Sequence, residues 1–261
     1  MNTVQDPLPA ALAACPRGIA PTEWQARLQL AACYRIFDFW GWSEGIYNHI
    51  SLRVPGPEHH FLLNPFGLHY GEVTASNLVK VDLDGRLLSD SPWPINPAGF
   101  TPHATLHRHL AGAQCVMHTH TTAGMAVACS AQGLETTNFY AAQLSDRVAY
   151  HDFEGITLHA DEGPRLLASV GQRQAVILRN HGLLVWSETL PKALYTLWAL
   201  QRACEVQVAG AALGPRQPIG QAVRQGCVED ARRFLGGAAM GQDLFAAMLR
   251  RIDRLDPSWK Q

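Results

Sequence analysis

The residues best suited to chemistry in this sequence are histidines in two short motifs. In the first, His118 and His120 flank Thr119 directly after the apolar segment Cys115–Met117. Side chains two positions apart in a β-strand lie on the same face, so this spacing places two imidazoles side by side. Neighbouring imidazoles are typical ligands of Zn²⁺, Fe²⁺ or a similar ion, although packed or surface histidines give the same short motif by chance.

The second motif is Asn180-His181-Gly182, which follows the apolar segment Ala175–Leu178. A histidine at a strand end lies where sheet proteins place ligand-binding groups, although such a residue can also be purely structural. Taken together, His118, His120 and His181 have the donor set of one metal site. We therefore predict that these three residues bind a single divalent cation.

The surrounding pattern predicts the elements that must position these side chains. Apolar segments of period 2 indicate short strands, and a period near 3.6 indicates helices. The expected strands cover residues 48–54, 60–64, 78–82, 114–118, 147–152 and 175–178, and the expected helices cover 23–40, 103–110, 122–131, 163–170 and 188–212. Strands and helices that interleave without repeats predict an α/β sandwich with a mostly antiparallel sheet.

The length of 261 residues suffices for one large domain. We predict a single domain over residues 1–261, with a loose N-terminal lead-in at 1–21 and a helical C-terminal extension at 213–261. Thr22 is the expected N-cap of the first helix, and Thr101 is the expected N-cap of the helix that carries His103.

Composition restricts the partners and the compartment. The net charge of −1 creates no field that would attract nucleic acid or anionic lipid, and no apolar run approaches the 18 or so residues of a membrane span. Residues 1–21 lack the basic start and apolar core of a secretory signal. The six cysteines are scattered without a C-x-x-C pair, which favours reduced thiols. We expect a cytoplasmic protein that binds a small molecule.

Several further motifs occur in an order that is typical of one known family. They are Gly41-Trp42, Tyr47–Arg53, Asn64–Gly67, Glu72–Ser76, Ala98–Thr101, His118–His120, Arg179–Gly182 and Ala203–Glu205. Over about two-thirds of its length, the chain resembles the class II aldolase/adducin family, most closely the adducin-head branch and its bacterial relatives. The resemblance implies a three-layer α/β/α sandwich, a homotetramer with sites at subunit boundaries, and a divalent metal, usually zinc, on His118, His120 and His181.

The sequence departs from the sugar-phosphate aldolases of this family near the metal site. Those enzymes carry P-S-S-E, in which the glutamate is a metal ligand and the acid/base, whereas this chain has Pro97–Phe100, so the carboxylate position falls on about Gly99. The serines that bind phosphate are replaced as well. Each lost polar contact to a charged group weakens binding by on the order of 1.5–3 kcal/mol. A phosphorylated substrate is therefore not expected.

Proton transfer at such a site needs a substitute for the missing glutamate. His103 lies one helical turn after Gly99, so it is our first candidate, either as the acid/base or as a fourth ligand. A surface histidine on the same helix is the alternative interpretation, and His107 and His109 are expected on its solvated face. The resemblance also implies a tyrosine as proton donor, often from a neighbouring subunit, and Tyr140 is the candidate.

Three functions agree with these residues. The first is a metal-dependent lyase that uses Zn²⁺, or alternatively Fe²⁺ or Mn²⁺. It would catalyse aldol cleavage or decarboxylation, through a metal-stabilised enolate, of a small non-phosphorylated carbonyl or carboxylate substrate. Family relatives that lack the glutamate include decarboxylases of aromatic acids. The alternatives are a non-catalytic, adducin-like structural or binding module and an Fe(II)-dependent oxygenase.

Overall fold

The computed structural model describes residues 14–261, so most of the expected lead-in lies outside the described residues. The described chain forms one seven-stranded sheet with the strand order β3-β2-β1-β4-β7-β6-β5. The strands are β1 (His49–Arg53), β2 (Phe61–Leu63), β3 (Val79–Val81), β4 (Cys115–Thr119), β5 (Val148–His151), β6 (Ala175–Leu178) and β7 (Gly182–Ser187). Strands β5 and β6 pair in parallel, whereas the other neighbours are antiparallel. The expected mostly antiparallel sheet is confirmed.

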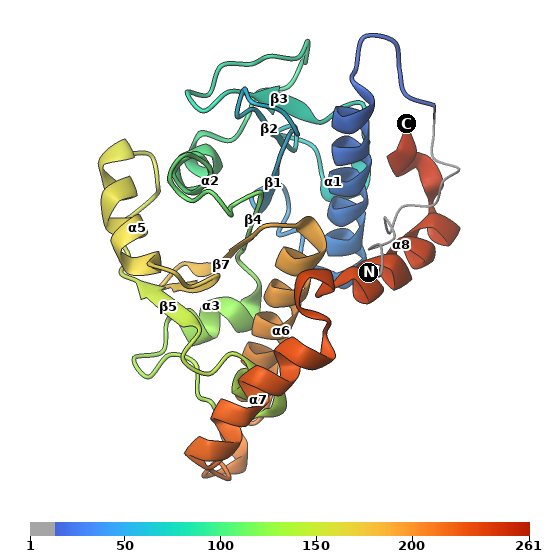
Figure 1. The fold of residues 1–261 in the computed structure, drawn as a ribbon. Helices are drawn as coiled ribbons and strands as arrows, with labels where there is room; N and C mark the ends of the chain where they lie inside the picture. The colour runs from blue at the N-terminus through green and yellow to red at the C-terminus, as the bar shows by residue number, and fades with distance from the viewer. Residues whose placement is uncertain (1–13) are drawn as a thin grey trace.

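Helices cover both faces of this sheet. The helices are α1 (Pro21–Trp40), α2 (Pro97–His109), α3 (Thr122–Ala128), α4 (Phe139–Gln143), α5 (Gly163–Val170), α6 (Leu190–Ala209), α7 (Gln221–Phe234) and α8 (Gln242–Leu255). Figure 1 shows α2 and α5 on one side of the sheet and α1, α6 and α8 on the other. The three-layer α/β/α sandwich is therefore confirmed. None of the helices in residues 14–261 combines the length and apolarity needed to cross a membrane.

The alternation of side chains along the strands divides the apolar core between the two faces. On β4, Cys115 and Met117 pack in the larger core with α1 and α6, whereas Val116 packs in a second core with α2 and α5. His118 follows the same alternation and lies on the α2 side, with 2% of its surface exposed. The His118-Thr119-His120 motif thus begins at an interior position of the central strand.

Two helix starts differ from the sequence predictions. Helix α1 begins at Pro21 after Ala20, so Thr22 is not its N-cap. Helix α2 begins at Pro97, and the side chain of Asn96 accepts a hydrogen bond from the backbone N–H of Ala98, so Thr101 is not its N-cap either. Asn followed by Pro is itself a strong helix start. The earlier start places positions 99 and 103 in one continuous helix.

The C-terminal segment is helical as expected, because α7 and α8 follow α6. It returns to α1, where Arg35 forms an ion pair with Asp256 and Trp259 is fully buried. Its last residues also bind the loop before β3, because the backbone N–H groups of Ala75 and Ser76 donate hydrogen bonds to the carbonyls of Trp259 and Gln261.

Candidate metal centre

The first two histidines of the predicted site lie at the end of β4. His118 is opposite His49 on β1 and opposite Leu184 on β7. His120 follows the strand, and its backbone N–H donates to the side-chain oxygen of Asn48 over 2.9 Å. The backbone is thereby held on both sides, and the two imidazoles turn toward each other with 2.7 Å between their Nε2 atoms.

The third histidine is presented by a tight turn between β6 and β7. Asn180 adopts a left-handed conformation with φ of 57°, which Asn tolerates better than most residues, and its N–H donates to the Ala128 carbonyl. Gly182 passes so close to the carbonyl oxygen of Thr119 that a Cβ there would overlap with it. The Asn-His-Gly motif is thus explained by the turn, which carries His181 to the end of β4.

The three side chains converge on one point. The Nε2 atoms of His181 and His120 are 3.0 Å apart, and the candidate ligand atoms of all three residues lie within 4.8 Å of one another. The Nδ1 of His118 contacts the carbonyl oxygen of Leu183 at 2.9 Å. Because a carbonyl only accepts, Nδ1 carries the hydrogen and Nε2 offers its lone pair to the centre, as in many metal-bound histidines.

The electrostatics also suit a cation. Burial lowers the pKa of His118 well below its usual value, and burial together with the neighbouring His120 and His151 lowers the pKa of His181 to about 4. Burial lowers the pKa of His120 as well, although the nearby carboxylate of Glu44 opposes that shift. The rings are therefore neutral at pH 7, and neutral imidazoles are the form that binds metals. His118, His120 and His181 can bind a metal ion.

Position 99 cannot supply the carboxylate that sugar-phosphate aldolases have there. A Cβ on Gly99 would lie 2.5 Å from Cδ2 of His49, so the His49 ring fills the space that a side chain at position 99 would need. His49 in turn packs against His118, with 4.9 Å between the ring centroids. The imidazole of His49 therefore occupies the space beside the candidate metal centre, where Gly99 of α2 has no side chain.

Behind His49 lies a buried chain of hydrogen bonds that the sequence did not suggest. Nδ1 of His49 is 2.8 Å from Nε2 of His103, and Ser51 Oγ lies 2.6 Å from Nδ1 of His103 and 2.7 Å from Nε2 of His107. Nδ1 of His107 is 2.7 Å from the Ala113 carbonyl oxygen. All three imidazoles are at most 6% exposed.

The carbonyl at one end fixes the direction of this chain. Burial lowers the pKa of His107 to about 3 and the pKa values of His103 and His49 well below normal, so the three rings are neutral. His107 must donate to the Ala113 carbonyl, so its Nε2 accepts from Ser51, which then accepts from His103. His103 accepts in turn from His49. Nε2 of His49 is left as the acceptor end of the chain.

These contacts qualify the predictions for α2. His107 is fully buried, so the expectation of a solvated position was wrong for this residue, whereas His109 is exposed. His103 is not a surface residue, and both of its ring nitrogens contact His49 and Ser51 rather than the three converging histidines. Its role in proton transfer or as a fourth ligand stays a prediction.

Tyr140 lies on α4, a helix of five residues that is too short to give a periodic signal. Its ring packs edge-on against Trp198 with 5.4 Å between centroids, and the guanidinium of Arg202 lies 5.7 Å from its centroid. These contacts are with α6. Its role as a proton donor, in particular across a subunit boundary, also stays a prediction.

A small enclosed cavity adjoins the converging histidines. Its volume of about 10 Å³ corresponds to roughly one water molecule. Its walls are formed by His49, Pro102, His118, Thr157, Glu162, Leu166, Leu178, His181 and Leu184. Glu162 is the one carboxylate among these walls, and no sequence motif pointed to it.

Comparison with known proteins gives the family. Residues 28–208 match the model of the class II aldolase and adducin N-terminal domain. The "Putative aldolase class 2 protein" of Pseudomonas aeruginosa is 41% identical over 93% of this chain and 95% of its own length. Mouse alpha-adducin is 44% identical over 70% of this chain, which corresponds to 25% of the length of alpha-adducin.

Solved structures agree with this assignment. An aldolase II superfamily protein from Pseudomonas syringae is 39% identical, with a TM-score of 0.87 over 93% of this chain and 98% of its own. An L-fuculose 1-phosphate aldolase from Glaciozyma antarctica is 26% identical, with a TM-score of 0.82 over 95% of this chain and 97% of its own. The matched region, the sheet and the three converging histidines lead to one conclusion: this chain belongs to the class II aldolase and adducin N-terminal domain family.

Proposed function

We propose that this protein is a metal-dependent lyase that cleaves a carbon–carbon bond, by aldol cleavage or decarboxylation, in a small non-phosphorylated carbonyl or carboxylate compound. The observation that carries the proposal is the convergence of His118, His120 and His181. A divalent cation held there would act as a Lewis acid and stabilise the negative charge that develops on a carbonyl or carboxylate oxygen. Three neutral imidazoles leave the charge of such a cation uncompensated, which strengthens that effect.

The start of α2 supports an unphosphorylated substrate. Ala98 and Gly99 offer no side-chain donor where the phosphate-binding aldolases have serines, and Phe66 replaces a hydroxyl in the loop after β2. Loss of several donors to a dianion weakens its binding by orders of magnitude. We expect millimolar sugar phosphates to leave the melting temperature unchanged, and a clear rise would contradict this part of the proposal.

Two further side chains complete the proposal. His103 would act as a positioning residue, because its contact with Nδ1 of His49 orients that ring beside His118. Tyr140 would donate a proton to the site of a neighbouring subunit in a homotetramer. Zinc is the metal that we propose, with Fe²⁺ and Mn²⁺ as alternatives, and the cytoplasm is the proposed compartment.

An adducin-like binding module is the second candidate, and the 44% identity to mouse alpha-adducin favours it. Metal analysis of protein purified without chelator distinguishes the candidates. Stoichiometric zinc supports the lyase, an empty site supports the binding module, and iron with uptake of dioxygen supports an oxygenase. For the lyase, we expect the zinc-loaded protein to exchange the carbon-bound hydrogens of hydroxyacetone or pyruvate with deuterated solvent, as measured by NMR. The absence of exchange would contradict the enolate chemistry.

A further inference from the structure

The cavity beside the metal centre receives a carboxylate from an element far from α2 in sequence. Glu162 lies at the end of a short 3₁₀ segment (Ala160–Glu162) and directly precedes α5. It shares the walls of this cavity with His118, His181 and His49. The side chain of Glu162 is 12% exposed. A buried carboxyl group is costly unless it has a partner, so its position calls for an explanation.

The backbone around Glu162 accounts for its position. Glu162 is the N-cap residue of α5, yet its side chain forms no capping hydrogen bond, so the carboxylate is not used to complete the helix. The next residue is Gly163, where a Cβ would lie 3.0 Å from the hydroxyl of Thr105 on α2. The glycine lets α5 approach α2 closely. Glu162 is thereby brought to the wall that Pro102 of α2 also forms.

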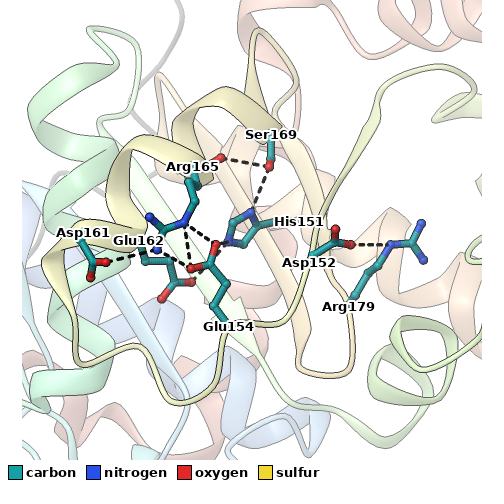
Figure 2. A network of polar contacts seen from close by, with 8 residues as sticks. All are labelled: His151, Asp152, Glu154, Asp161, Glu162, Arg165, Ser169 and Arg179. Atoms are coloured by element: carbon teal, nitrogen blue, oxygen red, sulfur yellow. Dashed lines mark hydrogen bonds and ion pairs between the residues drawn. The ribbon is translucent and has the colours of Figure 1, made fainter.

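His151 holds the carboxylate of Glu162 (Figure 2). Nε2 of His151 is 3.3 Å from Oε1 of Glu162, and Nδ1 of His151 is 3.0 Å from Ser169 Oγ. The Ser169 hydroxyl donates its hydrogen to the Arg165 carbonyl, so it must accept from Nδ1 of His151. A bond between Nε2 and Oε1 then requires one more proton. The pair is either an imidazolium with a carboxylate or an imidazole with a carboxylic acid, and in both forms it stores one proton.

The neighbouring acids Glu154 and Asp161 are held by Arg165, although Oε1 of Glu154 also lies 3.9 Å from Nε2 of His151. Arg165 binds Glu154 through Nε at 2.8 Å and lies 3.5 Å from Asp161, and Figure 2 shows both carboxylates beside the guanidinium. The Arg165 guanidinium lowers the pKa of Glu154, which keeps this residue charged, whereas burial raises the pKa of Glu162. Of these three acids, Glu162 is the one that borders the cavity with the metal-binding histidines.

We propose that Glu162, oriented by His151, is the carboxyl group that serves this metal centre as acid and base, in place of a glutamate at position 99. This inference rests on the proposed lyase function. In aldol cleavage, the Glu162 carboxylate takes the proton of the substrate hydroxyl, the carbon–carbon bond breaks with its electron pair on the α-carbon, and Glu162 returns the proton to that carbon. In decarboxylation, the bond to the carboxylate carbon breaks, its electron pair stays on the α-carbon and carbon dioxide leaves. Glu162 protonates the α-carbon, and a proton from solvent hydronium restores the acid.

The first test uses zinc alone, without a substrate. Zinc affinity is measured by competition with a chelator for the wild-type protein, Glu162→Gln and the matched variant Glu154→Gln, which removes a carboxylate from the same network. Loss of a charged group that faces the metal centre is expected to weaken zinc binding about 10–100-fold in Glu162→Gln. Glu154→Gln is expected to bind zinc like the wild type, and melting temperatures check that both variants fold.

Three results of this test would overturn the inference. The first is wild-type affinity in Glu162→Gln. The second is the same loss in Glu44→Gln instead, which would assign the carboxylate to the exposed residue that lies near His120. Glu162→Asp keeps the charge and is expected to retain more affinity than Glu162→Gln; equal losses in the two variants would also contradict the proposal. If the wild type binds no zinc, the proposed function itself fails.

The second test measures proton transfer at saturating zinc. Solvent deuterium exchange of hydroxyacetone and pyruvate is followed for the same variants. Removal of a general acid/base is expected to slow exchange about 100-fold or more in Glu162→Gln and to leave Glu154→Gln unchanged. Exchange at the wild-type rate in zinc-loaded Glu162→Gln would overturn the role of Glu162. Absence of exchange in the wild type would instead contradict the lyase chemistry, and zinc affinity alone would then decide whether Glu162 faces the metal.

Discussion

Two groups of three histidines lie side by side in this molecule, and they are organised in opposite ways. His118, His120 and His181 direct their nitrogens at one another, with Nε2 atoms 2.7 Å and 3.0 Å apart. Because the rings are neutral, their nitrogen lone pairs face one another, and only a shared proton or a cation can satisfy them. The buried group of His49, His103 and His107 instead forms a directed chain of donors and acceptors. Partner geometry, rather than residue type or burial, therefore distinguishes the three candidate ligands from the structural histidines.

The largest expected effect is the loss of metal binding when a histidine of the first group is replaced. We predict that His118→Ala and His181→Ala abolish stoichiometric metal retention while the protein still folds, because the sheet core lies on both sides of these residues and does not depend on a cation. Metal content by mass spectrometry and circular dichroism check this prediction. Wild-type metal content in either variant would show that the ligands are different residues.

The next largest effect is a loss of stability when a histidine of the second group is replaced. His107→Ala leaves the Ser51 hydroxyl and the Ala113 carbonyl without their partner in the interior. Unsatisfied buried groups cost about 1–3 kcal/mol each, so we expect the free energy of unfolding to fall by about 3 kcal/mol or more. Urea denaturation measures the change. Metal retention is expected to survive at neutral pH, and its loss would mean that the two groups act as one unit.

These two outcomes also bear on how much the sequence could predict. The fold class could be predicted from the periodicity of the segments. The convergence of the three histidines could be predicted from the i, i+2 spacing of His118 and His120 and from the Asn-His-Gly motif. Asn48–Val54 was predicted as a strand, so the common face of His49 and Ser51 could also be predicted. Their contact with His103 and His107 could not be predicted, because it depends on how α2 crosses the sheet.

Glu162 was missed for a similar reason. Its sequence neighbours Asp161 and Gly163 suggest an exposed turn, and only the packing of α5 on α2 brings its carboxylate to the cavity. The start of α2 was misplaced by five residues because Thr101-Pro102 and Asn96-Pro97 are both good helix starts. Helix α4 was not predicted, since five residues give no readable period.

A smaller effect concerns pH. The folded-state pKa of His107 is about 3, compared with 6.5 for an ordinary histidine. Because the folded pKa is the lower one, the unfolded chain binds more protons between pH 6.5 and 3. Stability is therefore complete above pH 6.5 and is lost as pH falls toward 3. In urea denaturation between pH 7 and 3, the free energy of unfolding should fall less steeply with pH in His107→Ala than in the wild type. Parallel curves would contradict a neutral, buried His107.

The smallest expected effect concerns the packing of His49 against His118, where the two groups of histidines meet. In Gly99→Ala, the added methyl group would overlap with the His49 ring, which must shift against His118. Overpacking of this kind costs about 1–3 kcal/mol, and we expect a modest fall in the melting temperature together with weaker zinc binding. An unchanged melting temperature and an unchanged zinc affinity would mean that His49 does not fill the space beside position 99.

We propose that three imidazoles from the end of β4 and the β6–β7 turn bind one cation. X-ray absorption spectroscopy of the zinc-loaded protein tests it most directly. We predict three histidine nitrogens at about 2.0–2.1 Å from one zinc ion, with the remaining coordination supplied by exchangeable solvent. A spectrum with fewer than three imidazole ligands, or with sulfur in the first shell, would contradict the claim.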